Sequence, residues 1–217
     1  MNNEFYFKST NDDRCFFKTK GLIEDQDPIK NSVDEKFSMA DIPPFLRTLL
    51  VADGTVTKTL EAYFWEPLEV KTIRQDFDIV DQNVAWLKIS AGEEIMTREV
   101  KLKGVDTDKI YVGAYSMINL DAVPEHFRGK LIDGRIGIGV LIRDSGLESY
   151  REIVDFGAEK DVADYYRSAA NSSSFEFADG ADGVESIDIV YRTYRIYLSG
   201  KPAILITERF PKEIYEA

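Results

Sequence analysis

The 217-residue sequence has very few of the side chains from which metal sites and many hydrolase sites are built. It contains one cysteine, Cys15, and one histidine, His126. A single cysteine excludes an internal disulfide, and a single histidine leaves little from which to build a zinc site or a Ser-His-Asp triad. We therefore expect no metal, and we interpret His126, within Pro-Glu-His-Phe-Arg, as a surface residue of a helix.

Positive charge is also scarce, since 27 lysines and arginines stand against 39 acidic residues, for a net charge of -12. Nucleic acid and anionic membranes bind basic patches, so this charge argues against both as partners. No stretch approaches the roughly 18 apolar residues of a membrane span. The first residues, MNNEFYFKSTNDDRCFF, lack the apolar core of a secretion signal. We expect a cytoplasmic protein, in which an anionic substrate needs a locally positive pocket.

What the chain does contain is enough apolar sequence for a sizeable core. It is 44% hydrophobic and 30% charged, which is ordinary for a soluble globular protein. Residues 1–35 are polar with scattered aromatics and predict an N-terminal extension. Residues 36–217 predict a single domain.

The hydrophobic pattern predicts six strands that form hairpin pairs. They span residues 55–65, 68–77, 94–103, 109–119, 191–198 and 203–211. Helical spacing and end signals predict helices over 41–54, 121–132, 147–153 and 161–170, and composition predicts a loop over 171–183. Together these elements indicate an α+β fold, with one six-stranded antiparallel sheet and helices on one side.

Glu208 is the first residue that does not suit its place in this pattern. Counting by twos along 203–211 puts it on the same face as Ile204, Ile206 and Phe210. A carboxylate on an apolar sheet face is costly unless it is paired or protonated. Glu208 is therefore a candidate functional residue.

Arg98 is the second such residue, because it alternates with the apolar Met96 and Val100 in the strand 94–103. If Arg98 and Glu208 face one interior, each must be engaged with the other or with a ligand. A purely structural alternative exists. A turn at Gly200-Lys201 would place Arg195 diagonally across from Glu208, within reach of an ion pair. The pattern leaves both possibilities open.

Four segments in this order resemble the chorismate pyruvate-lyase family. They are ValAlaAspGlyThrValThrLysThrLeuGlu (51–61), MetThrArgGluValLysLeu (96–102), IleGlyIleGly (136–139) and LeuSerGlyLysProAlaIleLeuIleThrGluArgPhePro (198–211). The resemblance extends over about residues 40–212. It implies a six-stranded antiparallel sheet, a buried site closed by helical flaps, and no metal or organic cofactor. The implied reaction removes pyruvate from chorismate and leaves the aromatic acid 4-hydroxybenzoate.

The resemblance also implies roles for particular residues. Arg98 matches the arginine that binds the ring carboxylate, and Glu208 matches the glutamate near the 4-position. The chemistry of the elimination makes Glu208 the best-placed base or proton relay, and the sequence leaves open whether it takes the proton or only orients the substrate. Val56 and Ile138 match positions whose backbone touches the product's carboxylate. Gly139 ends the same glycine loop, which we expect to approach the ligand closely.

Two alternative functions remain open at this point, and the sequence departs from the family pattern in several places. A similar fold serves as the effector-sensing domain of some transcription regulators, where it binds small acids without turning them over. A lyase for a modified substrate is the other alternative, because Tyr115 stands where the compact bacterial lyases have an arginine near the ligand passage. Lys58 is read either as a partner for the substrate's second carboxylate or as a solvated lysine. Residues 1–35 and 168–187 have no counterpart in those lyases, and the sequence does not give the oligomeric state.

Overall fold

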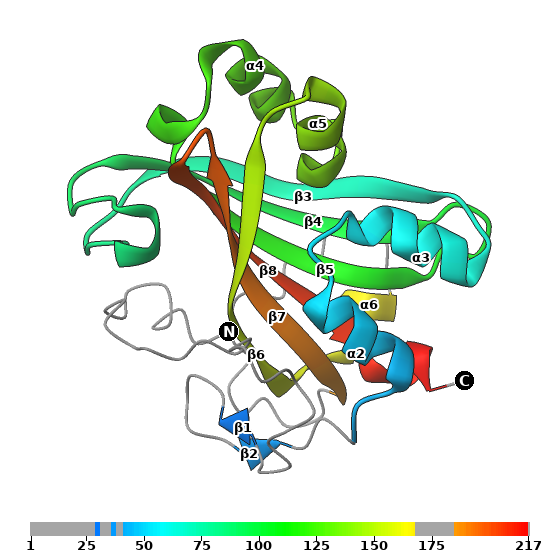
Figure 1. The fold of residues 1–217 in the computed structure, drawn as a ribbon. Helices are drawn as coiled ribbons and strands as arrows, with labels where there is room; N and C mark the ends of the chain where they lie inside the picture. The colour runs from blue at the N-terminus through cyan, green and yellow to red at the C-terminus, as the bar shows by residue number, and fades with distance from the viewer. Residues whose placement is uncertain (1–28, 31–35, 38–40, 168–184, 217) are drawn as a thin grey trace.

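The computed structural model describes residues 29–30, 36–37, 41–167 and 185–216. Its centre is an antiparallel six-stranded sheet with the order β3-β4-β5-β8-β7-β6 (Figure 1). The strands are β3 (Leu68–Ile79), β4 (Glu94–Gly104), β5 (Ile110–Ile118), β6 (Ser149–Val162), β7 (Ser186–Leu198) and β8 (Lys201–Pro211). The predicted α+β class and six-stranded antiparallel sheet are confirmed. A separate pairing joins β1 (Ile29–Lys30) to β2 (Lys36–Phe37), and residues 1–28, most of the predicted extension, lie outside the described residues.

Two pairs of helices cover one face of the sheet (Figure 1). One pair is α2 (Pro44–Val51) with α3 (Val56–Phe64), called here the α2–α3 cover. The other is α4 (Glu125–Asp133) with α5 (Ile138–Ser145), the α4–α5 cover. Shorter elements are α6 (Ala163–Arg167) and the 3-10 turns η2 (Ala85–Leu87), η3 (Leu120–Ala122) and η4 (Lys212–Tyr215). Within the described ranges, no helix has the length and apolar character needed to cross a bilayer.

Each cover buries its own apolar cluster against the sheet. The α2–α3 cover packs Leu46, Leu49 and Leu60 against the sheet residues Val112 and Phe210. The helices predicted over 41–54 and 121–132 are confirmed in these covers, although α4 begins at Glu125. His126 is exposed on α4, as expected.

The α4–α5 cover packs in the same way at the other end of the sheet. Phe127 and Leu131 of α4 and Leu141 of α5 bury against Met96 and Ile204. The two clusters are separate, so the sheet face between them is where a pocket has room to form.

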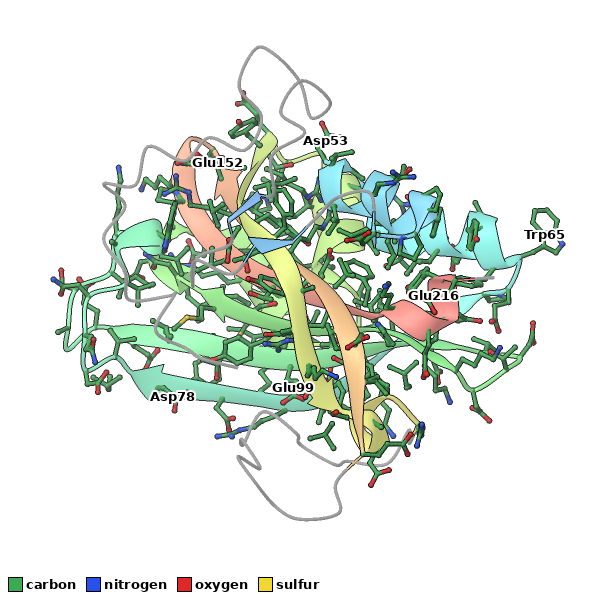
Figure 2. All side chains as sticks on the ribbon, turned by 90° about the horizontal axis from the view of Figure 1, so that it is seen from below. Asp53, Trp65, Asp78, Glu99, Glu152 and Glu216 are labelled. Carbon is green, nitrogen blue, oxygen red and sulfur yellow. The ribbon has the colours of Figure 1, made fainter. Side chains whose placement is uncertain are left out.

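The strand predicted over 55–65 is wrong, because this segment forms the helix α3. Val56 and Leu60 are buried four residues apart, which is helical spacing, and packing of this face outweighs the β-branched threonines. The helix ends at Trp65, whose left-handed backbone has φ 58°. Figure 2 shows Trp65 projecting beyond the end of α3, where its side chain is 90% exposed.

The helix predicted over 147–153 is also wrong, because it lies mostly within the strand β6. β6 pairs along its length with β7, and a β-bulge between Ile153 and Asp155 interrupts the two-residue alternation. The predicted segment ends before this bulge, and its strand residues Ser149 to Ile153 show no clear two-residue alternation of burial. The helix predicted over 161–170 is confirmed only as α6; residues 168–170 and the loop predicted over 171–183 lie outside the described residues.

The turn between β7 and β8 differs from the prediction by one residue. Ser199 and Gly200 form it, with φ values of 49° and 77°, and Leu198 pairs with Lys201. These two positive φ values suit the tight hairpin turn that matches strand twist. With a further register shift after Ile196, the residue opposite Glu208 is Arg192 rather than Thr193. A one-residue change moves every side chain of β7 to the other face.

The opposite face of the sheet is packed as well. It is contacted by η2 and α6, through clusters that include Trp86, Leu205 and Tyr165. Tyr115 belongs to this face, since its neighbours across the sheet are Glu99 and Thr207. Burial raises its pKa to about 12. Tyr115 therefore does not shape a pocket under the helical covers.

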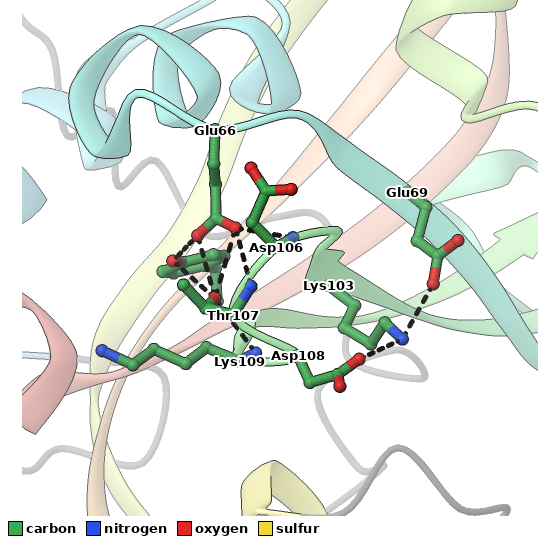
Figure 3. A network of polar contacts seen from close by, with 8 residues as sticks. Glu66, Glu69, Lys103, Asp106, Thr107, Asp108 and Lys109 are labelled. Carbon is green, nitrogen blue, oxygen red and sulfur yellow. Dashed lines mark hydrogen bonds and ion pairs between the residues drawn. The ribbon is translucent and has the colours of Figure 1, made fainter.

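Glu66, which is 7% exposed, clamps the α3–β3 turn to the β4–β5 loop (Figure 3). Its carboxylate accepts hydrogen bonds from the backbone N–H groups of Asp106 and Thr107, each at 3.2 Å, and from the hydroxyls of Thr107 and Tyr111. Burial alone raises the pKa of Glu66, but these donors outweigh it and hold the pKa below the usual 4.5. The stabilisation is therefore present above about pH 4.5 and is lost as the pH falls through the lowered folded pKa.

We expect Glu66→Gln to lower the free energy of unfolding by about 2 kcal/mol, because the amide group turns a donor toward other donors. Urea unfolding at neutral pH measures this loss. Glu69→Gln is the matched control, since Glu69 pairs with Lys103 at an exposed position and its loss costs less than about 1 kcal/mol. Equal losses in the two variants would show that the clamp has no special role.

Candidate functional site

Two neighbouring rows of residues cross the sheet between the two apolar clusters. In the first row, Arg98 on β4, Ser116 on β5, Ile206 on β8 and Tyr194 on β7 are successive partners. Adjacent strands lie about 4.8 Å apart, so the side chains of one row stand side by side on one face. This row places a cation, a hydroxyl and a phenol on the covered face.

The second row lies two residues further along each strand. Val100, Ala114, Glu208 and Arg192 are its successive partners on β4, β5, β8 and β7. Arg98 and Glu208 are thus two strands apart and one row apart, with backbones on the order of 10 Å from each other. They face the same interior, as the alternation of both strands predicted.

A pocket of about 590 Å³, counting its open mouth, lies over these two rows where the helical covers meet. All five residues proposed from the sequence line it, namely Arg98, Glu208, Val56, Ile138 and Gly139. Other lining residues are Thr55, Ser116, Arg151, Tyr194 and Ile206.

Among the described residues, Arg98 is buried without a carboxylate to balance it. It is 1% exposed, and its Nη2 donates to the backbone oxygens of Gly134 at 2.6 Å and Ile136 at 3.3 Å. In the described part of the chain, its Nε and Nη1 have no hydrogen-bond partner. Burial lowers the pKa of this guanidinium, with no acid acting in the other direction. An unpaired cation with two free donors in a pocket is suited to an anion.

Glu208, in contrast, is paired within the protein. Its Oε2 accepts from Arg192 Nε at 2.8 Å, and its Oε1 accepts from the Tyr194 hydroxyl at 2.9 Å. Burial raises the pKa of Tyr194, so the phenol remains a donor. Arg192 is itself 1% exposed and also donates to the backbone oxygens of Leu49 and Ala52. Glu208 is thereby held against the pocket and linked to the end of α2.

The alternative ion pair between Arg195 and Glu208 is wrong. The register shift after Ile196 puts Arg195 on the opposite face of β7, where its Nη2 lies 2.5 Å from Glu152. The structural alternative did anticipate that Glu208 has an arginine partner on β7. Its identity, Arg192, follows from the register and not from the spacing alone.

Two helices begin at the pocket. Val56 opens α3 after Thr55, and Ile138 opens α5 after Gly137. N–H groups in the first turn of a helix lack partners within the helix, and they favour negative charge. The covers approach closely here, since a Cβ on Gly139 would lie 3.3 Å from Thr55 Cγ2. The glycine loop was expected to approach a neighbour closely. In the structure that neighbour is the start of α3, in the α2–α3 cover.

The sequence reasoning missed four residues at this site: Ser116, Arg151, Arg192 and Tyr194. Placing the last two required the register shift after Ile196 as well as the turn at Ser199-Gly200, and alternation along the strand does not predict that shift. Arg151 was hidden by the helix predicted over 147–153. Lys58 is exposed and bound to Glu61 at 2.5 Å, in agreement with its reading as a solvated lysine.

The pocket contains no cysteine or histidine, and its lining has one carboxylate, Glu208. Within the residues that the structure describes, no three metal-ligating side chains come together. The arrangement is instead a short series of hydrogen-bond donors around an apolar floor. It can orient an anionic ring compound and place one carboxylate beside it.

Comparison with known sequences gives one family. The family model described as "Chorismate pyruvate-lyase Rv2949c-like" matches residues 50–217. A chorismate pyruvate-lyase of Mycobacterium leprae is 27% identical over 171 residues, covering 79% of this chain and 76% of its own length. The chorismate pyruvate-lyase of Mycobacterium tuberculosis H37Rv is 22% identical over 174 residues, covering 78% and 81%. A putative lyase of Methanocaldococcus jannaschii is 29% identical over 167 residues, covering 76% of each.

Comparison with solved structures supports the fold. The effector domain of PhnF from Mycobacterium smegmatis superimposes with a TM-score of 0.51 at 11% identity, covering 75% of this chain and 91% of that domain. The fold is therefore shared beyond the lyases.

Proposed function

The chain belongs to the chorismate pyruvate-lyase Rv2949c-like family, and on that premise we propose that it eliminates pyruvate from chorismate to leave 4-hydroxybenzoate. The observation that carries the proposal is the unpaired guanidinium of Arg98, buried in a pocket that also contains Glu208. Burying a cation without a partner is costly, and such a cost is retained where a ligand supplies the missing charge.

In the proposed complex, the ring carboxylate lies against Nε and Nη1 of Arg98. The first-turn N–H groups at Val56, Ile138 and Gly139 line the rest of the pocket and add donors to the bound anion. The ring lies on the apolar floor that Val100, Ala114 and Ile206 form. The 4-position of the ring then points toward Glu208, two strands away from Arg98.

The proposed reaction balances without a metal, an oxidant or a reductant. A proton leaves C4, its electron pair forms the C3–C4 double bond, and the C3–O ether bond breaks. The ring becomes 4-hydroxybenzoate, and the released enolpyruvate takes up a proton to become pyruvate. Since aromatisation drives the reaction, orientation and one base are sufficient.

Glu208 is the proposed base. Its two oxygens accept from Arg192 and Tyr194, but a carboxylate has about four acceptor positions, so lone pairs remain for the substrate. The two donors fix the orientation of the carboxylate, as a preorganised site requires. The 4-hydroxyl and the C4 proton of the substrate are the groups it meets.

The first experiment is to incubate the purified protein with chorismate and follow pyruvate with a coupled dehydrogenase. We expect pyruvate and 4-hydroxybenzoate in equal amounts, with no added metal or cofactor. A rate no higher than that of chorismate alone, in protein that is folded by circular dichroism, would contradict the proposal.

A second candidate function is binding of a small aromatic acid without turnover. The observation that favours it is the pairing of Glu208, whose oxygens both have partners in the protein. A rise in melting temperature with 4-hydroxybenzoate, together with no pyruvate from chorismate, would support it. The other alternative, a modified substrate, loses its main argument, because Tyr115 lies on the opposite face of the sheet.

A further inference from the structure

The charges that line the pocket do not balance within the described residues. Glu208 is offset by Arg192, which leaves two arginines, Arg98 and Arg151. In the ranges 41–167 and 185–216, neither has a carboxylate within ion-pair distance. A ligand with one negative charge would compensate the charge of one of these arginines and leave the charge of the other uncompensated.

Arg151 lies where the two helical covers meet. It is half-buried on β6, whose first residues rise toward α5 in Figure 1. Its Nη1 donates to the backbone oxygen of Asp53 at 2.6 Å; Figure 2 labels Asp53 after the end of α2. Its Nη2 is 3.7 Å from the position that a Cβ on Gly139 would take. The guanidinium therefore lies beside the first turn of α5 and near the start of α3.

The two arginines occupy different depths of the pocket. Arg98 is fully buried on β4, near one edge of the sheet, whereas Arg151 is partly exposed on β6, at the other edge. A guanidinium has five N–H donors, and within the described residues Arg151 uses one nitrogen, for Asp53. Donors thus remain at Arg151 for a second anionic group of the same ligand.

We propose that Arg151 binds a second carboxylate and so makes the pocket selective for dicarboxylates. This inference rests on the proposed function, in which the second group is the carboxylate of the enolpyruvyl side chain. The charges then balance at every stage. The substrate has two negative charges, and each product has one. After the C3–O bond breaks, 4-hydroxybenzoate remains at Arg98 and pyruvate at Arg151, nearer to the opening.

A purely structural role is the competing explanation for Arg151. Through Asp53 it ties β6 to the α2–α3 cover, so its loss would loosen the pocket. That effect would weaken the binding of every ligand to a similar extent. A second-carboxylate site instead predicts a loss for dicarboxylates and none for a monocarboxylate that uses Arg98 alone. The comparison between ligands therefore separates the two explanations.

The test measures two quantities in Arg151→Gln, namely KM for chorismate and the inhibition constant of 4-hydroxybenzoate. We expect KM to rise about 10- to 100-fold, as loss of one charge-assisted contact implies, while the inhibition constant changes less than about threefold. Arg151→Lys should recover part of KM. Arg143→Gln is the matched control, because Arg143 is an exposed cation of α5 that pairs with Asp144. It should change neither quantity.

Parallel losses for both ligands, or an unchanged KM, would overturn the inference. Calorimetric binding of chorismate and 4-hydroxybenzoate by the same variants keeps this result separate from the proposed function. If the wild-type protein releases no pyruvate, the proposed function fails. The selectivity is then still decided by whether Arg151→Gln weakens chorismate binding and spares 4-hydroxybenzoate. If Arg151→Gln does not fold, Arg151→Met, which also removes the charge, supplies the same comparison.

Discussion

Replacing Arg98 by methionine is expected to remove pyruvate release while leaving the protein as stable as the wild type or more stable. Methionine matches much of the apolar volume of arginine and has no charge. The variant loses the group that meets the ring carboxylate, and we expect kcat/KM to fall on the order of a hundredfold or more. Binding of 4-hydroxybenzoate should fall with it, as a thermal-shift titration measures.

The expected stability of Arg98→Met follows from how few partners the buried guanidinium has in the described residues. Arg98 Nε and Nη1 have no partner in the described residues, so the empty protein bears the cost of burying the cation. The carbonyl oxygens of Gly134 and Ile136 lose a donor in the variant, but the first still accepts from the Thr72 hydroxyl at 2.9 Å and the second belongs to an exposed residue. An unfolding free energy at or above the wild-type value is the expected outcome.

Arg209→Met is the control for Arg98→Met. Arg209 is equally buried in the same sheet, but its Nε lies 2.5 Å from Glu159. Its removal leaves an acid without its partner, so stability should fall by about 1–3 kcal/mol while KM stays unchanged. If Arg98→Met is as destabilised as Arg209→Met, Arg98 is a structural residue and the site assignment fails.

Replacing Glu208 by glutamine is expected to lower both activity and stability. The substitution keeps the size of the side chain and removes the proposed base, so kcat should fall about 10²- to 10⁴-fold. It also leaves Arg192, which is 1% exposed, without its carboxylate. Breaking a buried ion pair in this way costs about 3 kcal/mol, which urea unfolding measures.

Two further variants separate the effects at Glu208. Glu152→Gln breaks the half-exposed pair with Arg195 and should cost less than about 1 kcal/mol without changing kcat. The double variant Arg192→Met with Glu208→Leu removes both charges and should regain much of the stability but none of the activity. Wild-type turnover in Glu208→Gln would exclude Glu208 as the base.

The two charged residues of the pocket could be found in the sequence because each interrupts an apolar alternation. Arg98 lies between Met96 and Val100, and Glu208 between Ile206 and Phe210. Alternation is a local property of a strand, so it needs no knowledge of the partner strand. The class of the fold and the positions of the strands β3, β4, β5, β7 and β8, which all contribute to the pocket, follow from the same kind of local pattern.

The partner of Glu208 could not be found in this way. A turn at Gly200-Lys201 or at Ser199-Gly200 leaves Arg195 on the face of Glu208. The register shift between Ile196 and Tyr197 decides that Arg192 faces the pocket instead. The helix α3 and the strand β6 were assigned to the wrong class for a related reason. Each has weak local preference, and packing against the sheet or pairing with β7 decides its structure.

By itself, the sequence determined that Arg98 and Glu208 lie on apolar sheet faces, because alternation within a strand places each side chain. Only the tertiary structure decided that Arg192 neutralises Glu208, that Arg98 has no such partner among the described residues, and that Arg151 reaches the same pocket. The physical reason is that pairing of charges depends on register and on the meeting of distant segments. Neither is encoded in the spacing of residues along one strand.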